Sequence, residues 1–265
     1  MIDEMKNIQI TDRNELFDIA FIQVIGDRSS QEDSFGFKLY SNEGIIVVCD
    51  GMGGYEKGKE SSELAVKNFI NEYELQQPIL NPISFLQETS LRANQKIFDL
   101  VGVDGRKVTC GTTLVAVYIN GNALYWNSMG DSRAYLFRDG EMVQFTLDHN
   151  YSTVLNEQKK AGLITEERYN DEIKKGEALI SYLGMKDIGL IDYNNSPLYL
   201  EHKDRIIVMS DGLYKLLSDK EIKTVLLQEE DLNHALNSLE KIAANKSKIK
   251  QTKRDNMTVA LIAIR

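Results

Sequence analysis

Five acidic sites in this chain lie where a short apolar run ends or begins, and this pattern strongly constrains how the chain can fold. The sites are Glu32-Asp33, Asp50, Asp131, Asp211 and Asp255. Short apolar runs are typical of buried strands, so the carboxylates are expected at strand ends, where they could converge. Carboxylate oxygens suit Mg²⁺ and Mn²⁺, and the planar fork of Arg28, just ahead of Glu32, suits a phosphate. The sequence therefore predicts a metal site that holds a phosphate.

The apolar pattern favours antiparallel sheets with helices outside them, an α+β architecture. Helical spacing predicts helices over 60–74, 82–100, 219–229 and 232–247. Alternating or continuous apolar runs predict strands over 19–25, 34–40, 45–49, 112–119, 123–128, 133–138, 142–146, 205–209 and 257–264. Ser218 and Asp231 are expected to cap the last two helices. Helices do not alternate with strands one for one, which argues against a doubly wound parallel sheet.

Charge and cysteine content limit which classes of partner and which cellular location are expected. The formal charge of -9 and the pI near 5.0 give no reason to expect nucleic acid or an anionic membrane as a partner. The N-terminus is acidic where a signal peptide would be basic, and no apolar run approaches the ~18 residues of a membrane span. Cys49 and Cys110 stand inside apolar stretches and are expected to be buried free thiols, so a cytoplasmic location is predicted.

The acidic sites also have structural alternatives. Asp-Gly by itself marks a turn, Asp255 by itself fits a cap or a turn, and Asp131 could pair with Arg133. Asp104 and Asp139 fit such turns, since they lie between polar or hairpin residues. Asp50 and Asp211 differ, because each ends a buried apolar run. A carboxylate in that position is pushed to the rim of a sheet, and the joint pattern of all the sites favours the functional interpretation.

Other chemistries fit the sequence less well. Gly53, Gly58 and Lys59 have the spacing of a nucleotide-binding P-loop, but Glu60 stands where that loop needs Ser or Thr to bind Mg²⁺. The sequence has no Gly-x-Ser-x-Gly elbow and no His-x-x-x-His pair, which argues against a serine hydrolase and a zinc hydrolase. His149 is expected to be a structural histidine.

The order of the motifs resembles the type 2C metal-dependent serine/threonine protein phosphatases, the PPM family, in its bacterial-type form. The resemblance runs from about residue 22 to 264, and six motifs carry it: Arg28-x-x-Gln-Glu32-Asp33, Asp50-Gly-Met-Gly-Gly54, Gly111-Thr-Thr113, Gly130-Asp-Ser-Arg-Ala-Tyr135, Ser210-Asp-Gly-Leu213 and Asp255-Asn256. It implies a four-layer αββα sandwich, with two central antiparallel β-sheets flanked by helices. One phosphatase domain over residues 1–265, with a flap-like insertion at about 150–200, is expected.

The resemblance also implies a binuclear Mn²⁺ or Mg²⁺ site at the sheet ends. Asp50 would bridge the two ions. Glu32 and the Gly51 carbonyl would complete one ion, and Asp211 and Asp255 would complete the other. Asp131, together with Asp211, matches the position where bacterial-type members bind a third ion.

The implied reaction is hydrolysis of phosphoserine and phosphothreonine by in-line attack of a metal-bridging hydroxide. Two metals ~3.5–4 Å apart would acidify the water and stabilise the attacking and leaving oxygens. Arg28 would be a catalytic residue that binds the substrate phosphate, and Asp33 would orient metal-bound water. The expected partners are phosphorylated proteins, with a Ser/Thr kinase and its substrates among them.

The chain departs from the family pattern at several positions. Met52 stands where some members carry His, a candidate general acid, and Gln31 stands where Asn is usual. Residues 179–184 match the family pattern only loosely, and residues 151–176 are rich in mixed charge. In the family this region forms a flap that influences substrate choice. Substrate specificity is therefore the property that the resemblance predicts least well. The alternative function is a catalytically silent module that binds a phosphoprotein. Degenerate members usually lose a metal carboxylate, and this sequence has them all.

Overall fold

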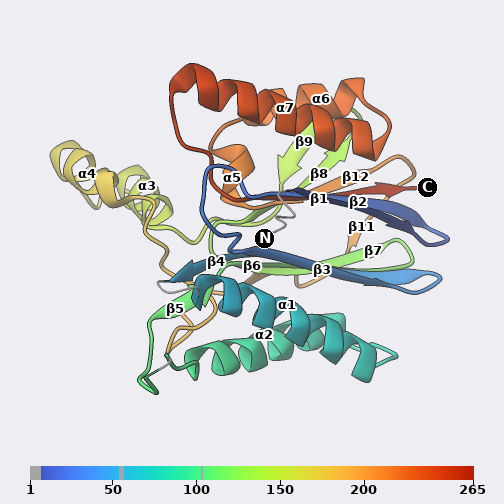
Figure 1. Cartoon of the computed structure of the whole chain (residues 1–265), viewed down its shortest axis with the longest axis horizontal. Coiled ribbons are helices and arrows are strands. Elements are labelled where there is room, and N and C mark those ends of the chain that lie inside the picture. The colour runs from blue at the N-terminus through green and yellow to red at the C-terminus, as the bar shows by residue number, and fades with distance from the viewer. Residues whose placement is uncertain (1–6, 54–56, 103) are drawn as a thin grey trace, which may run out of the picture.

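The computed structural model describes residues 7–53, 57–102 and 104–265. These residues form four layers, in which two antiparallel sheets stack face to face with helices on both outer sides (Figure 1). The predicted αββα sandwich is confirmed. In this view helices α6 (Asp219–Gln228) and α7 (Leu232–Lys250) cover the upper sheet, and α1 (Lys57–Leu75) and α2 (Pro82–Phe98) cover the lower one.

The first sheet joins the two ends of the chain. Its order is β1 (Asn7–Arg13), β2 (Phe17–Val24), β13 (Met257–Ile264), β12 (Arg205–Met209), β8 (Arg133–Arg138) and β9 (Glu141–Gln144). The last strand of the chain, β13, lies between β2 and β12 and pairs with both in antiparallel fashion. Val24 lies opposite Met257, and Met209 lies opposite Val259. The end of β2, the start of β13 and the end of β12 therefore meet at one rim.

The second sheet contributes the facing rim. Its order is β10 (Asp192–Tyr193), β7 (Ala123–Met129), β6 (Leu114–Asn120), β4 (Glu43–Gly53) and β3 (Asp33–Leu39). Two short strands lie off this path: β11 (Leu198–Tyr199) pairs with β7, and β5 (Cys110–Thr112) pairs with the end of β4. Asp33, the first residue of β3, lies directly opposite Asp50 of β4. The strand pairing thus brings two predicted site residues together.

The alternation of side chains along each strand explains the layers, because successive residues face opposite sides of a sheet. In β12, Ile206 and Val208 pack between the two sheets, whereas Ile207 and Met209 pack against the helices α5 (Asp211–Tyr214), α6 and α7. In β4, Ile46 faces the other sheet and its neighbours face α1 and α2. Both strands are buried on both faces, which is why their sequences read as continuous apolar runs.

The helix caps agree with the sequence signals. Ser218 and Glu221 form a capping box at the start of α6, and the Asp231 side chain accepts a hydrogen bond from the His234 amide at the start of α7. Asn81 caps α2 and Pro82 opens it. The strong caps fix where the outer helices begin, and the two predicted caps are confirmed.

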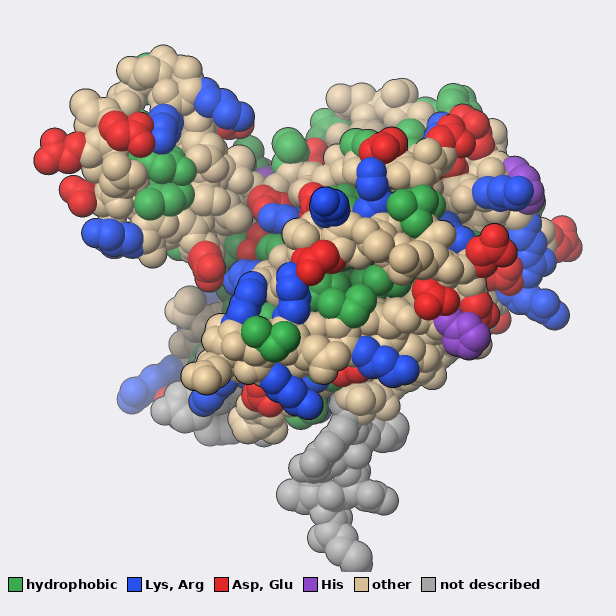
Figure 2. All heavy atoms as spheres, turned by 90° about the horizontal axis from the view of Figure 1, so that it is seen from above, with side chains coloured by type: hydrophobic (Ala, Val, Ile, Leu, Met, Phe, Trp, Pro, Cys, Tyr) green, Lys and Arg blue, Asp and Glu red, His purple; other side chains and the backbone are tan. Residues whose placement is uncertain are grey.

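An insertion interrupts the sandwich after β9. Helices α3 (Tyr151–Lys160) and α4 (Glu166–Glu172), followed by a 3-10 turn (Ile173–Lys175), project to the side of the layers in Figure 1. Figure 2 shows this part as a lobe beside the body, with acidic, basic and hydrophobic side chains interspersed on it. The first of these helices begins at Tyr151. The flap-like insertion at about 150–200 stays a prediction.

Some elements differ from the sequence-based expectation. Strand β1 was not predicted, and its residues are mostly exposed because it forms an edge of the first sheet. Strand β4 continues to Gly53, beyond the predicted end at Cys49, because its last residues pair with β5. Cys49 and Cys110 are buried free thiols, as predicted. In the part of the chain that is described, no helix is long and apolar enough to span a membrane.

Phe21 gives a direct test of the inter-sheet core. Its ring is fully buried and stacks on Phe35 and Phe37, with centroid distances of 4.6 and 5.1 Å. Replacing Phe21 by Ala should lower the free energy of unfolding by about 3–5 kcal/mol, because the change leaves a cavity between the sheets. Urea denaturation measures this. The control Leu163→Ala, at a side chain that is 74% exposed, should change stability by less than about 0.5 kcal/mol. Equal effects of the two changes would contradict this packing.

Candidate metal centre

A polar pocket of about 390 Å³ opens at the rim where the strand ends meet. It is lined by Arg28, Ser29, Ser30, Glu32, Asp50, Gly51, Met52, Gly53, Asp211, Asp255 and Asn256. The pocket therefore gathers six of the predicted site residues from four separate segments. The other two, Asp33 and Asp131, are buried residues that act electrostatically on Asp50. Gly54, the last residue of one predicted motif, lies outside the described residues, as does part of the P-loop-like segment.

Asp50 is held from behind by two threonines. The Thr113 hydroxyl accepts a hydrogen bond from the Asp50 amide at 2.9 Å, and the Thr113 amide donates to the Asp50 carbonyl at 2.8 Å. The Thr112 hydroxyl donates to the same carbonyl at 2.9 Å, and the hydroxyls of Thr113 and Ser132 lie 2.7 Å apart. In the sequence, the Gly111-Thr-Thr113 motif indicates only the resemblance to the family. In the structure, its threonines fix the backbone that presents the Asp50 carboxylate.

Close backbone approach explains two of the glycines near the pocket. A Cβ on Gly51 would lie 2.2 Å from the Gly58 carbonyl oxygen and 2.6 Å from that of Glu32. A Cβ on Gly58 would lie 2.3 Å from Oε2 of Glu32. Only glycine fits at either position. The start of α1 thus packs directly against Glu32, one of the predicted ligands.

Asn256 joins the loops that carry the remaining residues. Its Oδ1 accepts a hydrogen bond from the Glu32 amide at 2.8 Å, and its Nδ2 donates to the carbonyls of Ile25 and Ser30 at 2.9 and 3.0 Å. The loop after β2 and the start of β13 are therefore locked together. Asn256 was noted in the sequence only as part of a motif, because these contacts span more than 200 residues of the chain.

Asp33 does not line the pocket but is buried beside it, directly opposite Asp50 in the neighbouring strand. Its Oδ2 accepts a hydrogen bond from the Ser210 hydroxyl at 2.8 Å, whereas its Oδ1 has no hydrogen-bond partner. Burial raises the pKa of Asp33 to about 7, although the Ser210 and Thr258 hydroxyls oppose the shift. A carboxyl with this pKa can hold or release a proton near neutral pH.

The other buried carboxyls are shifted in the same direction. Burial, followed by the charge of Asp33 and then of Asp211, raises the pKa of Asp50 well above its usual range. Burial and the charge of Asp211 raise the pKa of Asp131 to about 6. The carboxyls destabilise one another's ionised forms, and a nearby cation would relieve this repulsion.

Two cationic side chains contact the acidic rim. Nη2 of Arg28 donates to Oδ2 of Asp255 at 2.5 Å, and Nζ of Lys215 donates to Oδ2 of Asp211 at 2.7 Å. The Arg28 side chain is 59% exposed and stands at the mouth of the pocket. Lys215 was not predicted as a site residue. Its position one helical turn after Asp211 is the sequence signal that could have revealed it.

The donor set fits hard divalent cations. It consists of carboxylates and a backbone carbonyl, which are the ligands that Mg²⁺ and Mn²⁺ prefer. Oδ1 of Asp211 is buried without a hydrogen-bond partner and is free to coordinate. Among the described residues, no three His, Cys, Asp or Glu side chains stand at coordinating distance from one point. The carboxylates therefore line one pocket, but their oxygens do not converge on a single point.

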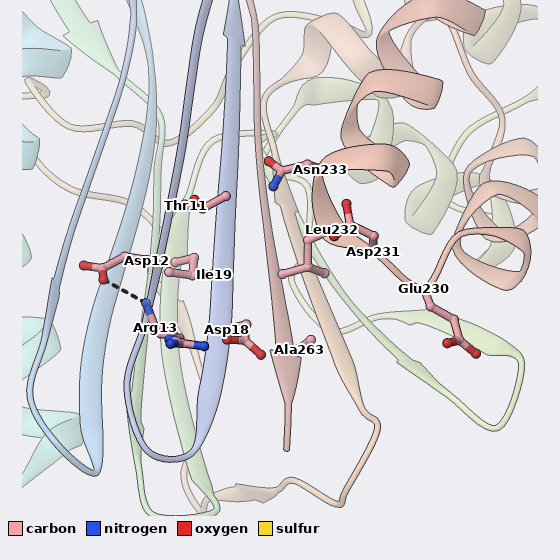
Figure 3. Close-up of a pocket in the computed structure, with 10 residues that line it drawn as sticks. All are labelled: Thr11, Asp12, Arg13, Asp18, Ile19, Glu230, Asp231, Leu232, Asn233 and Ala263. Atoms are coloured by element: carbon pink, nitrogen blue, oxygen red, sulfur yellow. Dashed lines mark hydrogen bonds between the residues drawn. The ribbon is translucent and has the colours of Figure 1, made fainter.

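Another pocket, of about 530 Å³, lies at the opposite end of the first sheet (Figure 3). Arg13 and Asp18, which line it, pair where β1 meets the start of β2, far along the strand from Val24. None of the predicted site residues reaches this pocket. It is therefore not part of the candidate metal centre.

Two further expectations concern single residues. Met52 lines the metal pocket and carries no group that can donate a proton. His149 is buried, and its Nδ1 has no hydrogen-bond partner. Burial lowers its pKa, so the neutral form is favoured. This environment fits the expected structural role.

Known proteins resemble the chain over nearly its whole length. The family model for protein phosphatase 2C matches residues 24–251. The protein phosphatase PhpP of Streptococcus pneumoniae is 29% identical over 252 residues, which cover 93% of this chain and 97% of PhpP. The solved serine/threonine phosphatase of S. agalactiae superposes with a TM-score of 0.80 at 29% identity, over 94% of this chain and 100% of that one.

A second similar structure contains metal. It is the catalytic domain of the serine/threonine protein phosphatase PstP in complex with two manganese ions. Its TM-score is 0.74 at 25% identity, over 94% of this chain and 98% of that chain.

The pKa of Asp33 predicts a pH-dependent effect of its removal. The folded-state value of about 7 lies above the ~3.9 of an unfolded chain. Between about pH 4 and 7 the folded state keeps a proton that the unfolded state releases, so the free energy of unfolding falls as pH rises through this window. Asp33→Asn cannot ionise and should lose this part of the fall.

Urea denaturation in EDTA at pH 5 and pH 8 measures the difference. The Asp33→Asn variant should gain stability relative to wild type at pH 8 compared with pH 5. The exposed control Asp171→Asn should show the same difference from wild type at both pH values. A pH-independent effect of Asp33→Asn would contradict the raised pKa.

Proposed function

The chain belongs to the protein phosphatase 2C family, and on that premise we propose how its residues perform the reaction. It is a metal-dependent phosphoprotein phosphatase that hydrolyses phosphoserine and phosphothreonine. One observation carries the assignment of its active site: Glu32, Asp50, Asp211 and Asp255 line a single pocket with Arg28 at its mouth.

We propose that this pocket holds two Mn²⁺ or Mg²⁺ ions. Glu32, Asp50 and the Gly51 carbonyl would hold one ion, and Asp50, Asp211 and Asp255 would hold the other. When bound, the ions lower the pKa of a coordinated water and neutralise the oxygens of the phosphate. The raised pKa of Asp50 supports this proposal, because burial among like charges is tolerated best beside a cation.

Arg28 would bind the substrate phosphate. Its guanidinium can donate two parallel hydrogen bonds to phosphate oxygens, and its exposed side chain can meet a substrate that arrives from solvent. The contact with Asp255 positions Arg28 beside the proposed ligands. When a phosphate binds Arg28, it would replace Asp255 as the partner of the guanidinium. The Asp255 carboxylate would then be free to coordinate its ion.

Asp33 would orient the attacking water and accept its proton. Its Oδ1 has no hydrogen-bond partner, so it is free to accept a hydrogen bond from that water. Ser210 holds the other oxygen, so the carboxyl cannot rotate freely. Met52 cannot protonate the leaving alkoxide, so the proton would come from water.

The substrate protein would be selected outside the pocket. The insertion formed by α3 and α4 is proposed to act as a flap, since it projects beside the body (Figure 1). Phosphorylated proteins are the substrates, and a Ser/Thr kinase acting on the same proteins is a proposed partner. The two buried free thiols support the proposed cytoplasmic location.

Metal dependence tests the proposed function. Hydrolysis of p-nitrophenyl phosphate and of a phosphothreonine peptide should require Mn²⁺ or Mg²⁺, stop in excess EDTA, and return when the metal is restored. The reason is that no residue of the pocket can by itself neutralise the phosphate and activate water. Turnover that EDTA leaves unchanged would contradict the proposal.

Asp211 tests the proposed ligand set. Asp211→Asn should lower kcat at least about a hundredfold, because an amide binds a hard cation more weakly than a carboxylate. The fold should survive, since the change removes a charge from an acidic cluster. Activity assays with Mn²⁺ and circular dichroism measure the two effects.

Asp139→Asn is the matched control. It changes the same residue type before a glycine, but in the turn between β8 and β9, where Asp139 has φ of 51° and Asn is well tolerated. Its activity should stay at the wild-type level. Full activity of Asp211→Asn would overturn its assignment as a ligand.

A further inference from the structure

Lys215 directs a positive charge to the corner formed by Asp211, which lines the metal pocket, and Asp131, which is buried and does not line it. Its Nζ lies 2.7 Å from Oδ2 of Asp211 and 3.4 Å from Oε2 of Glu177. The Lys215 amide donates to the Asp211 carbonyl at 3.0 Å, so the backbone turn of α5 sets the spacing of the pair. The ammonium therefore reaches Asp211 from its own helical turn.

Asp131 belongs to the same corner. Its carboxyl is buried, and the Asp211 carboxylate and the Lys215 ammonium are close enough to act on it electrostatically. The ammonium, in direct contact with Asp211, therefore lies near both carboxylates.

The neighbouring side chains hold this corner in shape. The Arg133 guanidinium stacks on the Tyr214 ring at 3.7 Å and donates to both carboxylate oxygens of Asp148, at distances between 2.7 and 3.2 Å. Tyr214 lies in α5 directly before Lys215, so these contacts fix the helical turn that carries the lysine.

We infer that Lys215 supplies from within the chain the positive charge that a third metal ion would supply at Asp131 and Asp211. The inference rests on the proposed binuclear site and concerns only the third position predicted from the sequence motif. An ammonium in direct contact with one of the two carboxylates neutralises part of their charge and repels an incoming cation. The enzyme is therefore binuclear at metal concentrations that fill its two main sites.

The same lysine connects the metal pocket to the insertion. Glu177 follows the 3-10 turn of the insertion, so the ammonium links this segment to a proposed metal ligand. A third metal ion would have to displace Lys215 from Asp211. Displacement would also release Glu177.

Equilibrium dialysis against Mn²⁺, with metal counted by atomic absorption, tests the inference without an activity assay. Wild type should bind two ions. Lys215→Met keeps the length of the side chain but loses its charge, and it should bind a third ion with a Kd at least about tenfold lower than any third site of wild type. Lys215→Arg keeps the charge and should remain at two ions.

Two further variants locate the third ion. The double variant Lys215→Met with Asp131→Asn should return to two ions, because it lacks the second carboxylate of the corner. Glu177→Gln removes only the more distant partner of Lys215 and should also bind two ions. Circular dichroism checks that each variant is folded. We expect the Lys215 variants to fold, because the Lys215 side chain is 38% exposed.

The outcomes distinguish a failure of the role of Lys215 from a failure of the proposed metal centre. Three ions in wild type, or two ions in Lys215→Met, would overturn the role of Lys215 and leave the binuclear site intact. Binding of no Mn²⁺ by either protein would overturn the proposed metal centre and this inference with it.

Discussion

Repulsion among carboxylates gathered at one rim is the constraint on which the rest of the structure depends. Asp33 and Asp50 face each other across neighbouring strands, and Asp131 and Asp211 add their charge to the same region. Such a group persists only if the surrounding fold imposes it and if cations compensate it. The hydroxyls of Thr112, Thr113 and Ser210 fix the acidic residues in place, and Arg28 and Lys215 contact the rim.

The three hydrophobic layers supply the rigidity that this arrangement requires. One core lies between the sheets, and one lies between each sheet and its helices. Because β12 and β4 take part in two cores each, their ends cannot shift without disturbing buried side chains on both faces. Asp211 lies two residues after the end of β12, and Asp50 lies within β4, so the rigid strands hold both carboxylates in place. Metal ligands at the ends of such strands are held more firmly than ligands on free loops.

Local sequence signals located most elements, and the exceptions have physical causes. The caps at Ser218 and Asp231 depend on neighbouring residues only and were correct. Strand β1 is an edge strand whose exposed residues leave little apolar pattern to detect. The end of β4 is set by pairing with β5, a contact between distant segments. The role of Asn256 and of the threonines behind Asp50 could not be predicted either, because their partners lie far away in the chain.

The sequence by itself determined the α+β class, with helices outside antiparallel sheets, and predicted the carboxylate set and the hard cations, because alternation, caps and ligand chemistry are local properties of residues. The four-layer αββα arrangement followed from the resemblance to the phosphatase family. Only the tertiary structure decided how these residues act together. The register of β3 against β4 sets Asp33 opposite Asp50, and burial then raises the pKa of Asp33 to about 7. The turn of α5 likewise brings Lys215 onto Asp211. Distance and solvent exclusion set these interactions, and both arise only when the chain is folded.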